Sequence, residues 1–105
     1  MMQDAELVKA IVEGFLEDMP KQIQLLKSYA EAGDCKMLER QAHTIKGAAA
    51  NMGADALRSI ALKLEEDSKQ GNPVLLAELV STLEKTYTDL QAVMKNSEAI
   101  ESQEE

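Results

Sequence analysis

Residues 41–53 read QAHTIKGAAANMG, and this stretch decides how the chain folds around its only histidine, His43. With a rotation of about 100° per residue, a helix through this region places five apolar residues within about 40° of one line. They are Leu38, Ala42, Ile45, Ala49 and Met52. This stripe predicts a helix whose inward face packs against a core, and it therefore determines which residues point outward.

The outward face of this predicted helix has an unusual composition. His43, Lys46, Gly47 and Ala50 occupy positions i, i+3, i+4 and i+7, so they are neighbours on that face. A glycine inside a helix costs roughly 0.5–1 kcal/mol relative to alanine, and no core packing offsets this cost on an outward face. We therefore predict that another molecule comes close to the backbone beside His43, and that Lys46 balances an anionic group carried by the imidazole.

Proline and glycine residues divide the rest of the chain into helical segments. Pro20 lacks a backbone donor and disfavours helical geometry at Met19, which predicts a break or a kink there, between an N-terminal helix and a second helix that starts near Pro20. Gly33 is expected to end the next helix, and Asp34 to cap the helix that carries the histidine. Residues 71–73 read Gly-Asn-Pro, a stop followed by a cap and a first-turn proline. The predicted fold is all-α, an antiparallel four-helix bundle with an additional N-terminal helix.

Length and composition fit one small helical domain. The chain has 105 residues, of which 45% are hydrophobic, 29% charged and 3% aromatic. Residues 1–96 are predicted to form the bundle, and the acidic, weakly apolar residues 97–105 a disordered tail. A single bundle with one exposed site predicts a monomer.

Charge and motif content argue against several classes of function. The formal net charge of −8 disfavours binding to nucleic acid or to an anionic membrane surface. No signal peptide or long apolar span is present, which predicts a cytoplasmic protein. One histidine and one cysteine exclude the usual structural zinc sets, and no Glu-x-x-His pair of a di-metal bundle occurs. Without a glycine-rich nucleotide loop, we expect no bound cofactor and no intrinsic kinase activity.

The segment around His43 resembles a known family. Residues 43–47, His-Thr-Ile-Lys-Gly, are preceded by Ala42 and followed by Gly53-Ala54, an arrangement similar to the histidine-containing phosphotransfer (HPt) domains of multistep two-component signalling. The resemblance covers roughly residues 5 to 95, and the flanking segments that carry it are Phe15–Pro20, Gly33-Asp34 and Leu64-Glu65.

The resemblance implies a phosphoryl carrier. His43 would accept a phosphoryl group on Nε2 from a receiver-domain phosphoaspartate and relay it to another receiver aspartate. Lys46 would neutralise charge on the phosphoryl oxygens, and Gly47 would leave clearance for the receiver. Glu65 would accept a hydrogen bond from Nδ1 and leave Nε2 free to attack. The implied partners are receiver domains of response regulators or hybrid histidine kinases, which would also supply any Mg²⁺.

Two more cations lie on the His43 side of the predicted helix, Lys36 and Arg40. Residues 34–51 carry three cations and two anions, which makes this segment locally basic in an acidic protein. Because receiver active sites are acidic, these cations and the small Ala50 are candidate partner-binding residues. The alternative is that they are ordinary solvated side chains.

Two other functions are compatible with the sequence. The first is the phospho-acceptor domain of a chemotaxis-type histidine kinase, which takes phosphate from ATP through a separate catalytic domain. The second is a helical interaction module without chemistry, which would tolerate His43→Gln and never form phosphohistidine.

Overall fold

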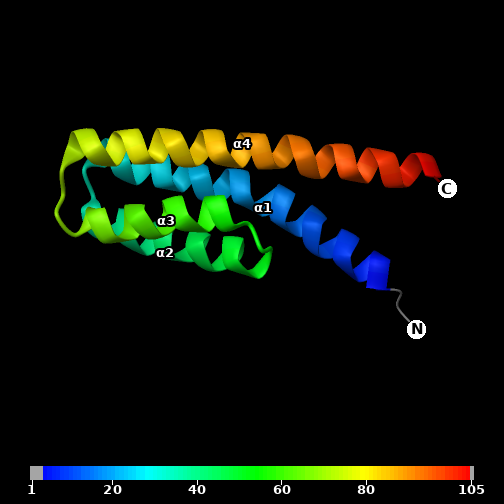
Figure 1. Cartoon of the computed structure of the whole chain (residues 1–105). Helices are drawn as coiled ribbons and strands as arrows, with labels where there is room; N and C mark the ends of the chain where they lie inside the picture. Colours follow the sequence, from blue (N-terminus) through cyan, green and yellow to red (C-terminus); the bar gives the residue numbers. More distant parts are fainter. Residues whose placement is uncertain (1–3, 105) are drawn as a thin grey trace.

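The computed structural model describes residues 4–104, with side chains described for residues 5–96. Within these residues it contains only helices: α1 (Asp4–Ala32), α2 (Cys35–Asn51), α3 (Asp55–Ser68) and α4 (Pro73–Glu104). Successive helices run antiparallel, and each packs against two others, so that α2 lies between α1 and α3 (Figure 1). The predicted all-α four-helix bundle is therefore confirmed.

The helix boundaries follow the expected capping residues. Asp34 accepts a hydrogen bond from the backbone N–H of Met37 at 3.1 Å, which satisfies a free donor at the start of α2. Asn72 caps α4 through the N–H groups of Val74 and Leu75, at 3.2 and 3.3 Å. Gly33 follows the last residue of α1 with a φ of 70°, a left-handed conformation that glycine adopts without steric cost. The predicted turns are thus made by the residues that the sequence indicated.

The core confirms the predicted rotation of α2. Of the five residues of the inward stripe, four are buried and Met52 is half-buried. Ala42 and Ala49 are fully buried, and such small residues let neighbouring helices approach closely. The same rotation leaves His43 exposed, so packing of the core determines the direction in which the imidazole points.

Of the break and the kink that Pro20 predicted, the break is wrong: α1 is one helix from Asp4 to Ala32 with Pro20 inside it. The expected additional N-terminal helix is therefore the first part of α1. Proline removes the N–H that would bond the carbonyl of Leu16, four residues earlier. That carbonyl accepts instead from the hydroxyl of Tyr87 on α4, at 3.4 Å. Met19 is 1% exposed, so a buried stripe continues through the proline and holds the helix together.

Replacing Tyr87 by phenylalanine should destabilise the protein by about 1 kcal/mol, because the carbonyl of Leu16 then loses the hydroxyl that donates to it in place of the proline N–H. Urea unfolding would measure this change. Tyr29→Phe is a matched control, since the half-buried Tyr29 hydroxyl makes no hydrogen bond within the described residues. Equal losses in the two variants would show that the hydroxyl of Tyr87 does not support the proline-containing helix.

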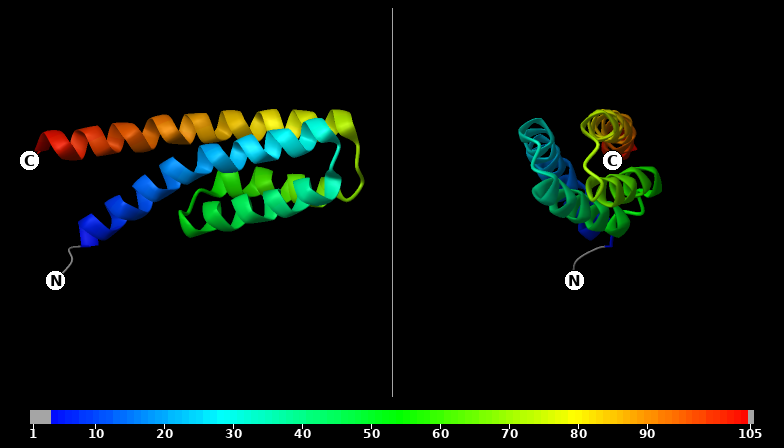
Figure 2. Two further views of the ribbon diagram at one scale, coloured as in Figure 1. Left: turned by 180° about the vertical axis from the view of Figure 1, so that it is seen from behind. Right: turned by 90° about the vertical axis from the view of Figure 1, so that its left-hand side faces the viewer.

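The outer helices extend beyond the α2–α3 hairpin (Figure 2). α1 has 29 residues and α4 has 32, compared with 17 in α2 and 14 in α3. α4 continues to Glu104, past the domain boundary predicted at residue 96. The division into a bundle and an acidic tail stays a prediction, because the side chains of residues 97–105 lie outside the described ones. Among the described helices, none is long and apolar enough to cross a membrane.

Candidate functional site

The hairpin of α2 and α3 brings together two residues that the sequence separates by 22 positions. His43 projects from the middle of α2, and its side chain is 66% exposed. Glu65 projects from the facing part of α3, and its side chain is 17% exposed. Nδ1 of His43 lies 2.9 Å from Oε2 of Glu65. The two helices therefore present an exposed imidazole held on one side by a mostly buried carboxylate.

Lys46 binds the other oxygen of the same carboxylate. Its Nζ lies 2.7 Å from Oε1 of Glu65, and its side chain is 25% exposed. One carboxylate thus bridges the imidazole and the ammonium. Three of the residues singled out in the sequence, His43, Lys46 and Glu65, form one connected group that spans α2 and α3.

The electrostatics of this group determine which nitrogen of His43 is available. The hydrogen bond from Lys46, aided by that from His43, lowers the pKa of Glu65 below its ordinary value of 4.5, against the opposing effect of burial. Glu65 is therefore ionised at neutral pH, and an ionised carboxylate can only accept hydrogen bonds. Nδ1 must carry the proton that it shares with Glu65. In the neutral ring, the lone pair then resides on Nε2.

Two small residues follow His43 on the exposed face of α2. Gly47 and Ala50 are both exposed on α2. A Cβ atom built at Gly47 would meet nothing within 4 Å, so no contact within the described residues requires a glycine there. The helix accepts the conformational cost of this glycine without any gain in its own packing. This observation supports a role for Gly47 in contact with another molecule.

A small hollow of about 280 Å³ opens next to the imidazole. The side chains that line it are Glu39, Arg40, His43, Thr44 and Glu65. Arg40 is thus placed beside His43, whereas Lys36 is exposed at the start of α2 and does not line this hollow. Thr44 donates its hydroxyl hydrogen bond to the backbone carbonyl of Arg40 at 3.2 Å.

Sequence reasoning missed two features of this site. It assigned Lys46 to a phosphoryl group, but not to Glu65, because a helical wheel of α2 does not include residues of the neighbouring helix. It also did not select Glu39 and Thr44, which line the hollow. Their spacing was a usable signal: Glu39 lies four residues before His43 on the same helix face.

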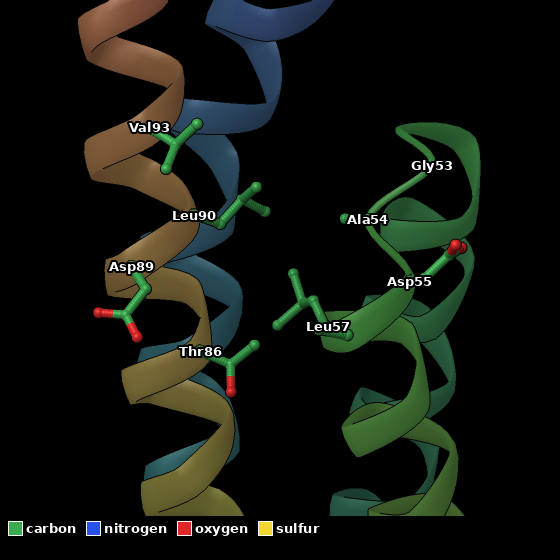
Figure 3. Close-up of a pocket in the computed structure, with 9 residues that line it drawn as sticks. Gly53, Ala54, Asp55, Leu57, Thr86, Asp89, Leu90 and Val93 are labelled. Atoms are coloured by element: carbon green, nitrogen blue, oxygen red, sulfur yellow. The ribbon is translucent and has the colours of Figure 1, made fainter.

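A larger hollow, of about 540 Å³, lies between the start of α3 and α4 (Figure 3). Leu57, Leu90 and Val93 point into it, and Asp55 and Asp89 point away from it on either side (Figure 3). Its lining contains no histidine or cysteine, and the described residues form no cluster of three His, Cys, Asp or Glu side chains suited to a metal ion. His43 therefore lies outside this hollow.

Two comparisons with known proteins find similar proteins. The family model of the Hpt domain matches residues 10–94. A crystal structure of histidine-containing phosphotransfer protein B (HptB) from Pseudomonas aeruginosa PAO1 is similar, with a TM-score of 0.80 and 26% sequence identity. The match covers 84% of this chain and 76% of that one. No curated protein sequence matches significantly.

Proposed function

The chain belongs to the Hpt domain family and is a histidine phosphotransfer protein of a phosphorelay, and from this premise we propose that His43 carries the phosphoryl group. Proteins of this family are phosphoryl carriers that interact with receiver domains. The observation that carries the assignment is the contact between His43 Nδ1 and Glu65 at 2.9 Å. In the neutral ring, this contact leaves the lone pair on Nε2 of the only histidine of the chain.

The transfer is a displacement at phosphorus. The Nε2 lone pair of His43 attacks the phosphorus of a receiver phosphoaspartate, a nitrogen–phosphorus bond forms, and the acyl oxygen–phosphorus bond breaks. The aspartate leaves as a carboxylate, and the imidazole ring becomes positively charged while Nδ1 keeps its proton. Glu65 stabilises this ring charge through its hydrogen bond, as the aspartate of a catalytic triad does. The reverse sequence delivers the group to a second receiver.

The surface around His43 suits a docked receiver. Gly47 and Ala50 leave room for the receiver active site to reach Nε2, and Lys36 and Arg40 attract its acidic residues. Lys46 balances the negative charge of Glu65 through their ion pair. We assign the Mg²⁺ that assists the transfer to the receiver, and no cofactor to this chain.

The proposal extends to the location, oligomeric state and partners of the whole protein. It acts as a cytoplasmic, monomeric carrier without kinase activity of its own, and its partners are receivers of response regulators or hybrid histidine kinases. The phospho-acceptor domain of a chemotaxis-type kinase is the second candidate, because it resembles this chain in bundle and motif. The two differ in the phosphoryl donor, which is a receiver aspartate in one and ATP with a catalytic domain in the other.

A panel of phosphorylated receiver domains tests this function. Each is mixed with the protein, and intact mass reports transfer. We expect one added phosphoryl group that is acid-labile and base-stable, as phosphohistidine is. Labelling only by a histidine-kinase catalytic domain with ATP would favour the chemotaxis-type function. Labelling by neither donor would leave a helical interaction module.

Glu65→Gln should slow transfer from a receiver by about 10- to 100-fold, which corresponds to the loss of one charge-assisted hydrogen bond. The amide can donate to Nδ1 and so favour the tautomer whose lone pair lies on the wrong nitrogen. Transfer kinetics and ¹⁵N chemical shifts of the imidazole measure the two effects. Glu66→Gln is the matched control, because Glu66 is exposed and adjacent in sequence. Similar rates in both variants would contradict the role of Glu65.

A further inference from the structure

We propose that the hollow beside His43 holds the phosphoryl group and that Arg40, rather than Lys46, binds its oxygens. This inference rests on the proposed function and specifies which cation binds the phosphoryl oxygens. Phosphorylation of Nε2 places close to two negative charges next to Glu39 and Glu65, which both line the hollow. A cation must therefore face the group directly.

Lys46 is poorly placed for this task. Its Nζ lies 2.7 Å from Oε1 of Glu65, and it does not line the hollow. Its hydrogen bond is also the largest cause of the lowered pKa of Glu65. If Lys46 moved to the phosphoryl group, it would leave behind a mostly buried carboxylate. Such an exchange of partners is unfavourable, because each anion then has a cation only part of the time.

Arg40 is available to bind the phosphoryl group. It is exposed, it lies three residues before His43 on the same helix face, and it is the only cationic side chain that lines the hollow. Within the described residues it forms no ion pair, and its guanidinium makes only a long contact of 4.0 Å with Met37 Sδ. A planar guanidinium can bind two phosphoryl oxygens at once, which an ammonium cannot do.

The other residues around the hollow do not replace Arg40. The hydroxyl of Thr44 already donates to the carbonyl of Arg40, so it offers no free donor. Glu39 carries a negative charge that opposes the incoming group. At about 280 Å³, the hollow is large enough to hold a phosphoryl group together with water molecules. Arg40 and His43 are therefore the two residues that give the hollow its affinity for an anion.

Phosphoramidate tests the proposal without a receiver. In this reaction Nε2 attacks the phosphorus, the nitrogen–phosphorus bond of the reagent breaks, and ammonia leaves. We expect Arg40→Gln to lower the phosphorylation rate at least tenfold and Arg40→Lys to restore part of it. Lys21→Gln, which removes an exposed cation of α1, should leave the rate unchanged. Lys46→Gln should instead raise the pKa of the Glu65 carboxyl group, followed by ¹³C NMR, which Arg40→Gln should not change.

NMR of the phosphorylated wild-type protein gives a direct readout. We expect the guanidinium N–H resonances of Arg40 to shift when phosphohistidine forms, and the ³¹P resonance to move in Arg40→Gln. A larger rate loss in Lys46→Gln than in Arg40→Gln, or equal rates in Arg40→Gln and Lys21→Gln, would overturn the assignment. If the wild-type protein forms no phosphohistidine with phosphoramidate or with any receiver, the proposed function itself fails.

Discussion

Replacing His43 by glutamine should abolish phosphoryl acceptance, with transfer from any receiver reduced by more than a thousandfold. No other imidazole is available in the chain to take over. The substitution should leave the fold intact, because the His43 side chain is 66% exposed and Glu65 keeps its ion pair with Lys46 at 2.7 Å. Substitutions at exposed positions usually change the free energy of unfolding by less than about 0.5 kcal/mol. Intact mass after incubation with phosphorylated receivers measures acceptance, and urea unfolding measures stability.

Moving the histidine to another helix tests whether an exposed imidazole alone is enough for phosphorylation, without the residues around position 43. In the double variant His43→Gln/Ser59→His, an exposed position of α3 carries the only histidine, in place of position 43 on α2. We expect this variant to remain unphosphorylated by receivers. Phosphorylation of His43→Gln by a receiver would show that His43 is not the acceptor. Phosphorylation of the double variant alone, with a base-stable product, would show that an exposed imidazole is sufficient without the site around His43.

The rotation of α2 could be predicted from the sequence because it depends on one helix and one core. Small and branched apolar residues at helical spacing indicated which side faces inward, and the buried residues of α2 follow that pattern. The outward position of His43 is a direct consequence. For the same reason the capping residues Asp34 and Asn72 were predictable, since a cap acts within a few residues of its own helix end.

Features that depend on two helices were harder to predict. The spacing of 22 residues between His43 and Glu65 suggested that they face each other across an antiparallel pair, but their contact requires the actual packing of α2 on α3. The link from Lys46 to Glu65 was not foreseen for the same reason. At Pro20 a local rule predicted a break or a kink. The helix continues, and the hydroxyl of Tyr87, 71 residues away from Leu16, donates to the carbonyl that the proline leaves without its usual N–H. Tertiary contacts decide whether a helix continues through a proline, and helix propensities do not include these contacts.

The position of Gly47 connects the fold to the partner, and it leads to the second prediction. Gly47→Gln should slow transfer from a receiver by at least a hundredfold, because displacement of reacting groups by about 1 Å can cost that much. The added side chain would stand on the exposed face of α2, one turn beyond His43, and would hold the receiver away from Nε2. Gly47→Ala, with a single added methyl group, should have a smaller effect.

The same substitution should stabilise the isolated protein. Gly47 is helical, and a Cβ there would meet nothing within 4 Å, so a better helix former should raise the free energy of unfolding by roughly 0.5–1 kcal/mol. Gly14 in α1 is the matched control, because it is also exposed and helical with nothing within 4 Å of an added Cβ. Gly14→Gln should give the same gain in stability without any loss of transfer.

A small phosphoryl donor shows whether the glutamine at position 47 blocks docking of the receiver or disturbs His43 itself. Phosphoramidate needs no docking surface, so Gly47→Gln should react with it as fast as the wild-type protein does, while transfer from receivers is slow. If both donors are slowed equally, the glutamine disturbs His43 itself. If neither is slowed, the receiver does not approach across this face of α2. Three results together would support the proposed role of Gly47: higher stability, normal reaction with the small donor and slow transfer from receivers. They would show that the glycine makes the helix less stable but lets the receiver reach His43.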